Sequence, residues 1–265
     1  MRHLLAAVLS LIIIGCKPKP AKNDQELQTT MEEGTQEKVY PEELVMVLEA
    51  HGGLDLWKNQ RTLSYVLARP DKPETHITDL WTRFDRIEMN DISMGYDGKT
   101  WLLDPSGAYK GNPEFYHNLM FYFYAMPFVL ADDGINYAEA EVLRFEGKEY
   151  PGIQITYNSG VGTSPKDEYY IHYNPESHKM EWLGYTVTYR TGEDSDNIKW
   201  IRYNDWGNFD GLILPNSISW YNYEGREIKD LRNTVEFEEI TLSSKSKSDS
   251  FYAKPIEAEY FVRPE

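Results

Sequence analysis

The histidines are the residues whose type and spacing first suggest chemistry. The chain has six of them, and His172 and His178 flank a turn at residues 174–177. Two histidines facing each other across a hairpin could hold a metal ion if a carboxylate such as Glu176 or Glu168 completed the site. The pair also fits two hairpin histidines with water or main-chain partners, which is the interpretation we favour. The sequence therefore predicts no metal site.

The other groupings of polar residues give no catalytic pattern. His51 and His117 lie on expected helices, which they can cap or pin. The acidic loop 193–197 lacks the spacing of a calcium loop, and the adjacent Asp167 and Glu168 point to opposite faces of a strand. The sequence has no Gly-x-Ser-x-Gly motif, no His-Glu-x-x-His motif and no Gly-rich phosphate loop. We predict no catalytic residue and no cofactor, and a binding protein rather than an enzyme.

Composition and charge exclude some functions. The formal net charge is −16 over 265 residues, which argues against binding nucleic acid, since neutralising phosphates needs a basic face. The chain has 20 Tyr, 10 Phe and 7 Trp, 37 aromatic residues in all, and aromatic residues favour strands and large contact surfaces. A single cysteine excludes an internal disulfide.

The N-terminus predicts secretion and a lipid anchor. A basic start, Met1-Arg2-His3, precedes residues 4–14, which are apolar apart from Ser10. Eleven residues are too few to span a bilayer as a helix, but they suit the apolar core of a secretory signal. The closing residues 13–16 resemble the lipobox of bacterial lipoproteins. That resemblance implies that the signal peptide, residues 1–15, is removed and that Cys16 is lipidated.

Residues 16–38 predict a flexible, lipid-anchored tether. They open with Lys17-Pro18-Lys19-Pro20 and continue with polar residues, too poor in apolar side chains to pack. We expect the lipid to attach the protein to the membrane, because a domain this acidic should be repelled by anionic headgroups. The start of the tether lacks the acidic cluster typical of surface-export signals, so we expect the outer membrane, facing the periplasm.

The remaining residues, 39–265, predict one β-rich domain. Pro41-Glu42-Glu43 is a favourable helix start. After residue 61 the chain alternates apolar and polar residues, most clearly over 153–158, with turn signals at hairpin distances. The pattern predicts an α+β fold: a highly curved antiparallel sheet, or half-barrel, of about ten strands. An N-terminal helix and a central apolar helix would cover its concave face.

The central apolar segment, residues 115–130, is the main candidate for a binding element. Asn112-Pro113-Glu114 is a good helix entry, and residues 119–131 carry no charge. A helix apolar on every side is buried on more than one side. Three interpretations stay open: a plain core helix, a lid over an apolar cavity, and insertion into a lipid surface. For the lid, the candidate ligand-binding residues are Phe115, Leu119, Met120, Phe123, Met126 and Phe128.

Several segments together resemble an uncharacterised family of Gram-negative envelope lipoproteins. They are residues 49–57 (EAHGGLDLW), 96–101 (YDGKTW), 112–118 with 125–128, 160–164, the Tyr-rich strand pair around Asn174-Pro175, and 211–215. That family is in turn distantly similar to the Lol-type lipoprotein carriers and receptors. The resemblance implies a half-barrel with a concave apolar groove for acyl chains, and it brings no catalytic residues. The lipobox fits the membrane-bound receptor type better than the soluble carrier.

Two functions follow as expectations. The first is a lipid-anchored protein that binds a hydrophobic small molecule, an acyl chain or a lipoprotein under the apolar lid; the sequence identifies no protein partner. The alternative is a surface-exposed glycan-binding lipoprotein. Its aromatic platform would be built from Trp81, Trp182, Trp200, Trp206 and Trp220.

Overall fold

The computed structural model describes residues 38–69, 71–160, 164–189 and 191–263. The expected signal peptide, Cys16 and nearly all of the tether lie outside these residues. Residues 39–265 form one compact unit with its own hydrophobic core. Within the described residues, no helix combines the length and the apolar character needed to span a membrane.

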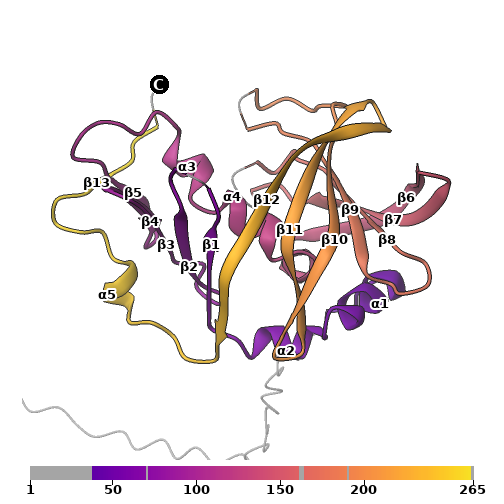
Figure 1. Ribbon diagram of the computed structural model, residues 1–265, viewed down its shortest axis with the longest axis horizontal. Coiled ribbons are helices and arrows are strands. Elements are labelled where there is room, and N and C mark those ends of the chain that lie inside the picture. Colours follow the sequence, from indigo (N-terminus) through magenta and orange to yellow (C-terminus); the bar gives the residue numbers. More distant parts are fainter. Residues whose placement is uncertain (1–37, 70, 161–163, 190, 264–265) are drawn as a thin grey trace, which may run out of the picture. The chain divides into compact units, whose positions relative to one another are not determined.

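The unit is built on one open antiparallel sheet of 13 strands (Figure 1). Two meanders compose it, and β12 lies between β11 and β1 and so joins them. The first meander is β1 (Thr62–Leu67), β2 (Glu74–Asp79), β3 (Asp85–Met89), β4 (Ile92–Tyr96) and β5 (Thr100–Leu103), with β13 (Glu259–Tyr260) at its edge. The second is β6 (Ile135–Phe145), β7 (Lys148–Tyr157), β8 (Tyr169–Tyr173), β9 (Met180–Tyr185), β10 (Lys199–Phe209), β11 (Leu212–Glu224) and β12 (Glu227–Ser243).

The antiparallel sheet is confirmed, but the expected number of about ten strands is too low. The additional strands are short. β5 has four residues and β13 has two, and runs of that length cannot display a clear alternation. The longer alternating run at 153–158 is confirmed, since Ile153 and Ile155 are buried in the core.

The helices are short and fall into three groups. The chain enters through α1 (Glu42–Ala50) and α2 (Leu54–Lys58). The connection between the two meanders carries α3 (Pro113–Tyr116), α4 (Leu119–Tyr124) and the 3-10 helix η1 (Phe128–Ala131). Near the C-terminus, α5 (Asp249–Tyr252) packs on the first meander, where the ring nitrogen of Trp101 donates to the carbonyl of Tyr252 at 3.0 Å.

The expected single central helix is wrong. The apolar segment forms three short helical pieces instead of one helix over 115–130. Pro113 starts α3 with Asn112 as its cap, and the Asn112 side chain accepts from the N–H of Phe115. Pro127 has no N–H to donate and cannot continue a helix, so α4 ends before it and η1 begins after it.

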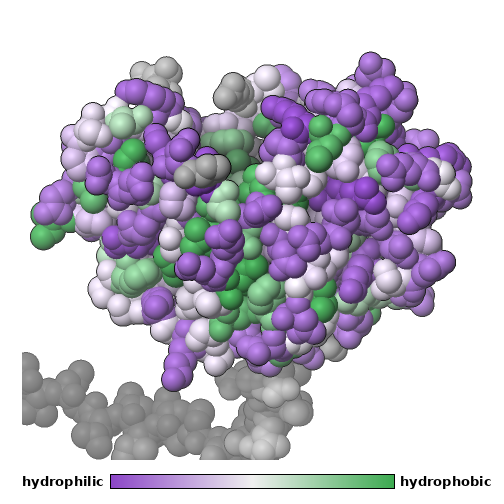
Figure 2. Space-filling view, viewed as in Figure 1, coloured by the Kyte–Doolittle hydropathy of each residue, from purple (hydrophilic) through white to green (hydrophobic). Residues whose placement is uncertain are grey.

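The sheet curves around α4. Side chains or main-chain groups of α4 contact five consecutive strands, through Tyr65 of β1, Phe237 of β12, Trp220 of β11, Tyr203 of β10 and Tyr185 of β9. A six-residue helix is about 9 Å long, whereas five strands span about 19 Å in a flat sheet. The five strands can all contact so short a helix because the sheet bends toward it. In the view of Figure 1, α4 lies beside β12, in agreement with its contact with Phe237. In Figure 2, apolar colours gather in the middle of the same view and polar side chains cover its two sides.

Candidate functional site

The apolar segment fills the inside of the curved sheet. Phe123 is 4% exposed, and its ring lies 5.1 Å from that of Tyr185 and 5.9 Å from that of Trp220. The buried hydroxyl of Tyr203 donates to the carbonyl oxygen of Phe123 at 2.8 Å. These contacts place α4 in the main core of the unit rather than on its surface.

Aromatic stacking fixes the two ends of the same segment. The ring of Tyr124 lies 4.5 Å from Tyr65 and 4.7 Å from Phe237. At the other end, Phe128 of η1 stacks on Trp57 of α2 at 4.6 Å and 7°. The helix α2 therefore closes over the end of the segment, which the sequence did not reveal.

The six candidate lid residues lie in three different environments. Met120, Phe123, Met126 and Phe128 are all buried in one core, so the structure brings these four together. Leu119 is half-buried and packs against that core. Phe115 is half-buried and lies apart from them on α3, with its ring 5.0 Å from that of Tyr189.

A pocket adjoins this core at the β6 edge of the sheet. Its cavity volume is about 350 Å³, within the range of small-molecule sites. The start of α1 and strands β6, β7 and β8 supply its walls, including Pro41, Glu43, Tyr137, Glu139, Ala140, Val142, Ile153 and Tyr173. Tyr137, Ile153 and Tyr173 also belong to or pack against the main core. The pocket and the core that the segment fills therefore share these three side chains, although no residue of 115–130 lines the pocket.

Buried polar side chains hold the entry of the apolar segment to the first meander. Between α3 and α4, Nδ1 of His117 lies 2.6 Å from a carboxylate oxygen of Asp85. Asp85 is 2% exposed, and burial raises its pKa to about 6 although the His117 hydrogen bond acts in the opposite direction. This contact confirms that His117 pins the segment.

A second buried polar group lies at the start of β2, whereas Asp85 lies opposite Thr78 near the end of that strand. Glu74 accepts from the hydroxyl of Tyr116 and pairs with Arg69 at 2.9 Å, although Glu74 is only 3% exposed. Neither Glu74 nor Asp85 is among the candidate residues that the sequence predicts. The available signal was the spacing of Glu74, His76 and Thr78, which places three polar residues on one face of a strand. All three are buried.

His51 and His172 are structural in their contacts. Nδ1 of His51 lies 2.8 Å from the carbonyl oxygen of Val47 at the end of α1, and its own carbonyl accepts from the N–H of Ile213. Burial lowers the pKa of His51 to about 4. His172 is fully buried beside Trp200, and burial lowers its pKa to about 4 as well. In the part of the chain that the structure describes, no three His, Cys, Asp or Glu side chains gather as metal ligands.

The expected aromatic platform does not form one surface. Trp182 and Trp200 are 0% exposed and belong to a second apolar cluster with Leu143 and Tyr150. Trp206 and Trp220 are half-buried against the main core. Only Trp81 among the five proposed tryptophans is largely exposed, at 62%, so the glycan-binding alternative has no support from their arrangement.

Solved structures give distant likenesses. A LolA superfamily protein from Nitrosomonas europaea is 11% identical, with a TM-score of 0.45 over 74% of this chain and 89% of that one. A DUF1329 family protein from Desulfovibrio piger is 10% identical, with a TM-score of 0.48 over 80% of this chain and 95% of that one. At this similarity neither likeness transfers a ligand or an activity.

The match to a protein family is more specific. No curated protein matches the chain. A family model matches residues 109–252, more than half of the chain, and that range includes the whole apolar segment. The resemblance to an uncharacterised family is thereby confirmed: the chain belongs to DUF6503, a family of unknown function.

Proposed function

We propose that this chain is a lipid-anchored envelope protein that binds an acyl chain, or the acyl groups of a lipoprotein, beneath the apolar segment 115–130. Lipidation at Cys16 would attach it to the outer membrane, facing the periplasm. The observation that carries the proposal is the burial of an uncharged, three-piece segment inside an open curved sheet, next to a pocket of about 350 Å³. A ligand in the pocket would contact Tyr137, Ile153 and Tyr173 of that core, and it would reach the segment only if the segment moves.

An acyl chain could replace the packing contacts that the segment now makes. Aromatic rings surround α4, and the hydroxyls of Tyr203 and Tyr137 reach the main-chain carbonyls of Phe123 and Leu130. Burying one methylene of an acyl chain gains about 0.8 kcal/mol. An acyl chain of ordinary length could therefore offset the loss of several of these packing contacts if the segment moves.

The ends of the segment define what could move. The pairing of His117 with Asp85 holds its start to β3, and the stacking of Phe128 on Trp57 holds its end to α2. We infer that α4 and η1 shift while His117 stays in place. Phe123, Met126 and Phe128 would then line the ligand channel, together with Met120 and Leu119, and Phe115 would lie at its start.

Two buried hydroxyls could receive the polar end of an acyl group. Within the described residues, Oη of Tyr65 and Oη of Tyr124 have no hydrogen-bond partner, and the two rings stack at 4.5 Å. A buried hydroxyl without a partner is destabilising. An ester or acid carbonyl that came within reach would accept from them.

Native mass spectrometry tests the proposal. Residues 39–265, exported to the periplasm and purified without detergent, should carry a phospholipid or an acylated species that organic extraction releases. A well-folded protein that is empty and that also fails to bind the neutral fluorophore N-phenyl-1-naphthylamine would refute it.

A matched pair of variants locates the ligand. Val142 lines the pocket and is 38% exposed, whereas Val45 on α1 is 41% exposed and does not line it. Val142→Trp should narrow the pocket and weaken fluorophore binding several-fold. Val45→Trp should leave it unchanged. Equal effects of the two substitutions would show that the fluorophore does not use this pocket.

A further inference from the structure

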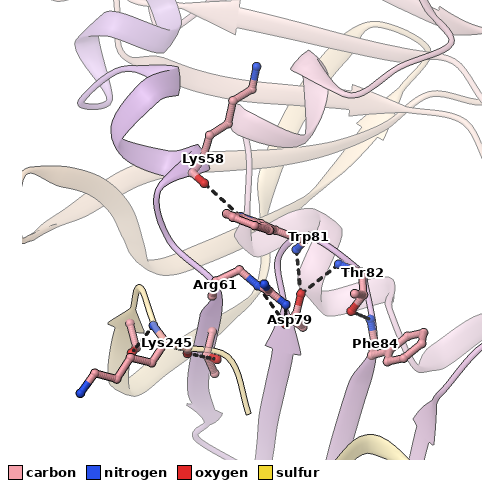
Figure 3. Close-up of polar contacts among 9 residues, drawn as sticks. Lys58, Arg61, Asp79, Trp81, Thr82, Phe84 and Lys245 are labelled. Atoms are coloured by element: carbon pink, nitrogen blue, oxygen red, sulfur yellow. Dashed lines mark hydrogen bonds and ion pairs between the residues drawn. The ribbon is translucent and has the colours of Figure 1, made fainter. Parts of the chain in front are cut away.

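Trp81 is an exposed tryptophan held in one orientation. It lies in the turn between β2 and β3 and is 62% exposed. Its ring nitrogen donates to the carbonyl of Lys58 at 3.0 Å, and its main-chain N–H donates to Asp79 at 2.9 Å. The guanidinium of Arg61 lies 4.4 Å from the ring centroid. Figure 3 shows the indole between Lys58 and Arg61. An aromatic side chain already fixed in place loses little conformational freedom when it binds a partner.

Asp79 holds Arg61 and the turn around Trp81 in place. Its carboxylate accepts from Arg61 at 2.7 Å and from the N–H groups of Trp81 and Thr82. Although burial acts to raise it, the hydrogen bonds from Arg61 and the main chain lower the pKa of Asp79. The turn is thus built around an ionised carboxylate that sets the positions of both Arg61 and Trp81.

The charge around Trp81 is opposite to that of the chain as a whole. Figure 3 shows Lys58 and Arg61 on either side of the indole, with Lys245 beyond Arg61. Asp79 pairs with Arg61, and Asp132, which lines the same small cavity as Trp81, pairs with Arg83. Lys58 and Lys245 add positive charge beside these two ion pairs, whereas the complete chain has a net charge of −16. The amine of Lys58 points away from the indole, and Lys58 and Lys245 are both exposed. A local excess of cations beside a fixed indole is complementary to anionic headgroups over an apolar layer.

The chain enters the unit on the same side. Trp81 and Ala131 line one small cavity of about 90 Å³ between α2 and η1. The hydroxyl of Tyr40, near the start of the described residues, donates to the carbonyl of Ala131 at 3.0 Å. Tyr40, near the start of the described residues, therefore contacts the same part of the unit as Trp81.

We propose that Trp81, with Lys58 and Arg61 beside it, is a membrane-surface contact whose indole enters the headgroup region of a bilayer that contains anionic phospholipid. This inference rests on the proposed function in one respect: the proposed lipid anchor determines which side of the unit faces the membrane. Because the whole chain is acidic, this contact would not recruit the protein by itself. It would orient a protein that is already attached.

Fluorescence quenching on vesicles tests the contact without relying on Cys16. Residues 39–265, a compact unit with its own core, would carry an N-terminal hexahistidine tag. They would bind vesicles of phosphatidylethanolamine, phosphatidylglycerol and a nickel-chelating lipid, with or without brominated acyl chains. Brominated lipid should quench the wild type more than Trp81→Phe, because the substitution removes only the exposed indole. Equal fractional quenching of both proteins would overturn the proposal.

Two further comparisons examine the role of the cations. Lys58→Glu should reduce the quenching assigned to Trp81, whereas Lys148→Glu, an exposed lysine at the start of β7, should not. Replacing phosphatidylglycerol with phosphatidylcholine should also reduce it. Quenching of the same size on both lipids would overturn the part of the proposal that assigns anionic headgroups.

Failure of the anchor is distinguishable from failure of the contact. If the full chain is recovered from its own envelope in the soluble fraction, the proposed lipidation is wrong. The vesicle comparison of wild type and Trp81→Phe still decides the role of Trp81, because the tag supplies the attachment.

Discussion

Acidification should destabilise the unit through its buried histidines, and His51 allows the effect to be isolated. His51 is 0% exposed, and its pKa falls from 6.5 to about 4 on folding because burial disfavours the charged ring. Between pH 6.5 and pH 4, the ring is therefore mostly neutral in the folded protein and mostly protonated in the unfolded chain. The stability that His51 contributes is complete above pH 6.5 and is lost as the pH falls toward 4.

The size of the loss follows from the two pKa values. Between pH 7 and pH 5, a group with a pKa of about 6.5 unfolded and about 4 folded lowers the free energy of unfolding by about 2 kcal/mol. His51→Asn removes the titrating ring and retains an N–H donor for the carbonyl of Val47. It also removes the ring contact with Trp206 at 4.6 Å, so we expect a cost of about 1–3 kcal/mol at pH 7. Its further loss at pH 5 should be about 2 kcal/mol smaller than that of the wild type.

Urea unfolding at the two pH values measures this difference, with tryptophan fluorescence as the signal. Groups that titrate in both proteins cancel in the comparison. Leu48→Ala on the same helix is the control. It removes a side chain that is 3% exposed and should cost about 2–5 kcal/mol at both pH values. If His51→Asn loses as much stability as the wild type between pH 7 and pH 5, the reasoning from burial is wrong.

Three other substitutions test separate parts of the structure. Asp85→Asn should steepen the rise in stability between about pH 4 and pH 6, because the raised pKa of Asp85 makes its ionisation unfavourable in the folded state and so opposes the gain from the buried histidines; an unchanged slope in urea unfolding across that range would contradict this. Trp57→Ala should cost about 3–5 kcal/mol and, by loosening η1, should tighten binding of N-phenyl-1-naphthylamine; unchanged affinity would count against movement of η1. Gly52→Ala should lower the melting temperature sharply, since its φ is +105° and the added Cβ would lie 2.3 Å from the carbonyl oxygen of Gly211; a wild-type melting curve would contradict that packing.

Local sequence signals predicted the hairpins well. Asp97-Gly98, Glu146-Gly147, Asp210-Gly211 and Glu224-Gly225 each lie in a turn between consecutive antiparallel strands. These residues accept the positive φ values that such turns need, and every glycine of the four pairs has one. Turn chemistry is local, so it can be recognised without knowing which strands pair.

The closure of the sheet could not be predicted in the same way. β1 pairs with β12, and Leu63 lies opposite Leu242 although 178 residues separate them in the chain. Alternation shows which face of a strand is buried but not which distant strand lies beside it. The same limit explains why no pattern linked the polar residues of β2 and β3 to the start of the apolar segment.

The apolar segment shows where composition and structure diverge. Its uncharged run correctly indicated burial on several sides, because Phe123, Tyr124 and Phe128 all lie inside the curved sheet. The same run predicts one continuous helix, but Pro127 interrupts it because proline has no main-chain N–H to donate. The consequence matters for the proposed function. One rigid helix would have to leave the sheet as a whole, whereas α4 and η1 are separate pieces with separate partners. A ligand could displace the Phe128–Trp57 stack while the pairing of His117 with Asp85 remains intact, so partial opening requires the loss of fewer contacts than complete release.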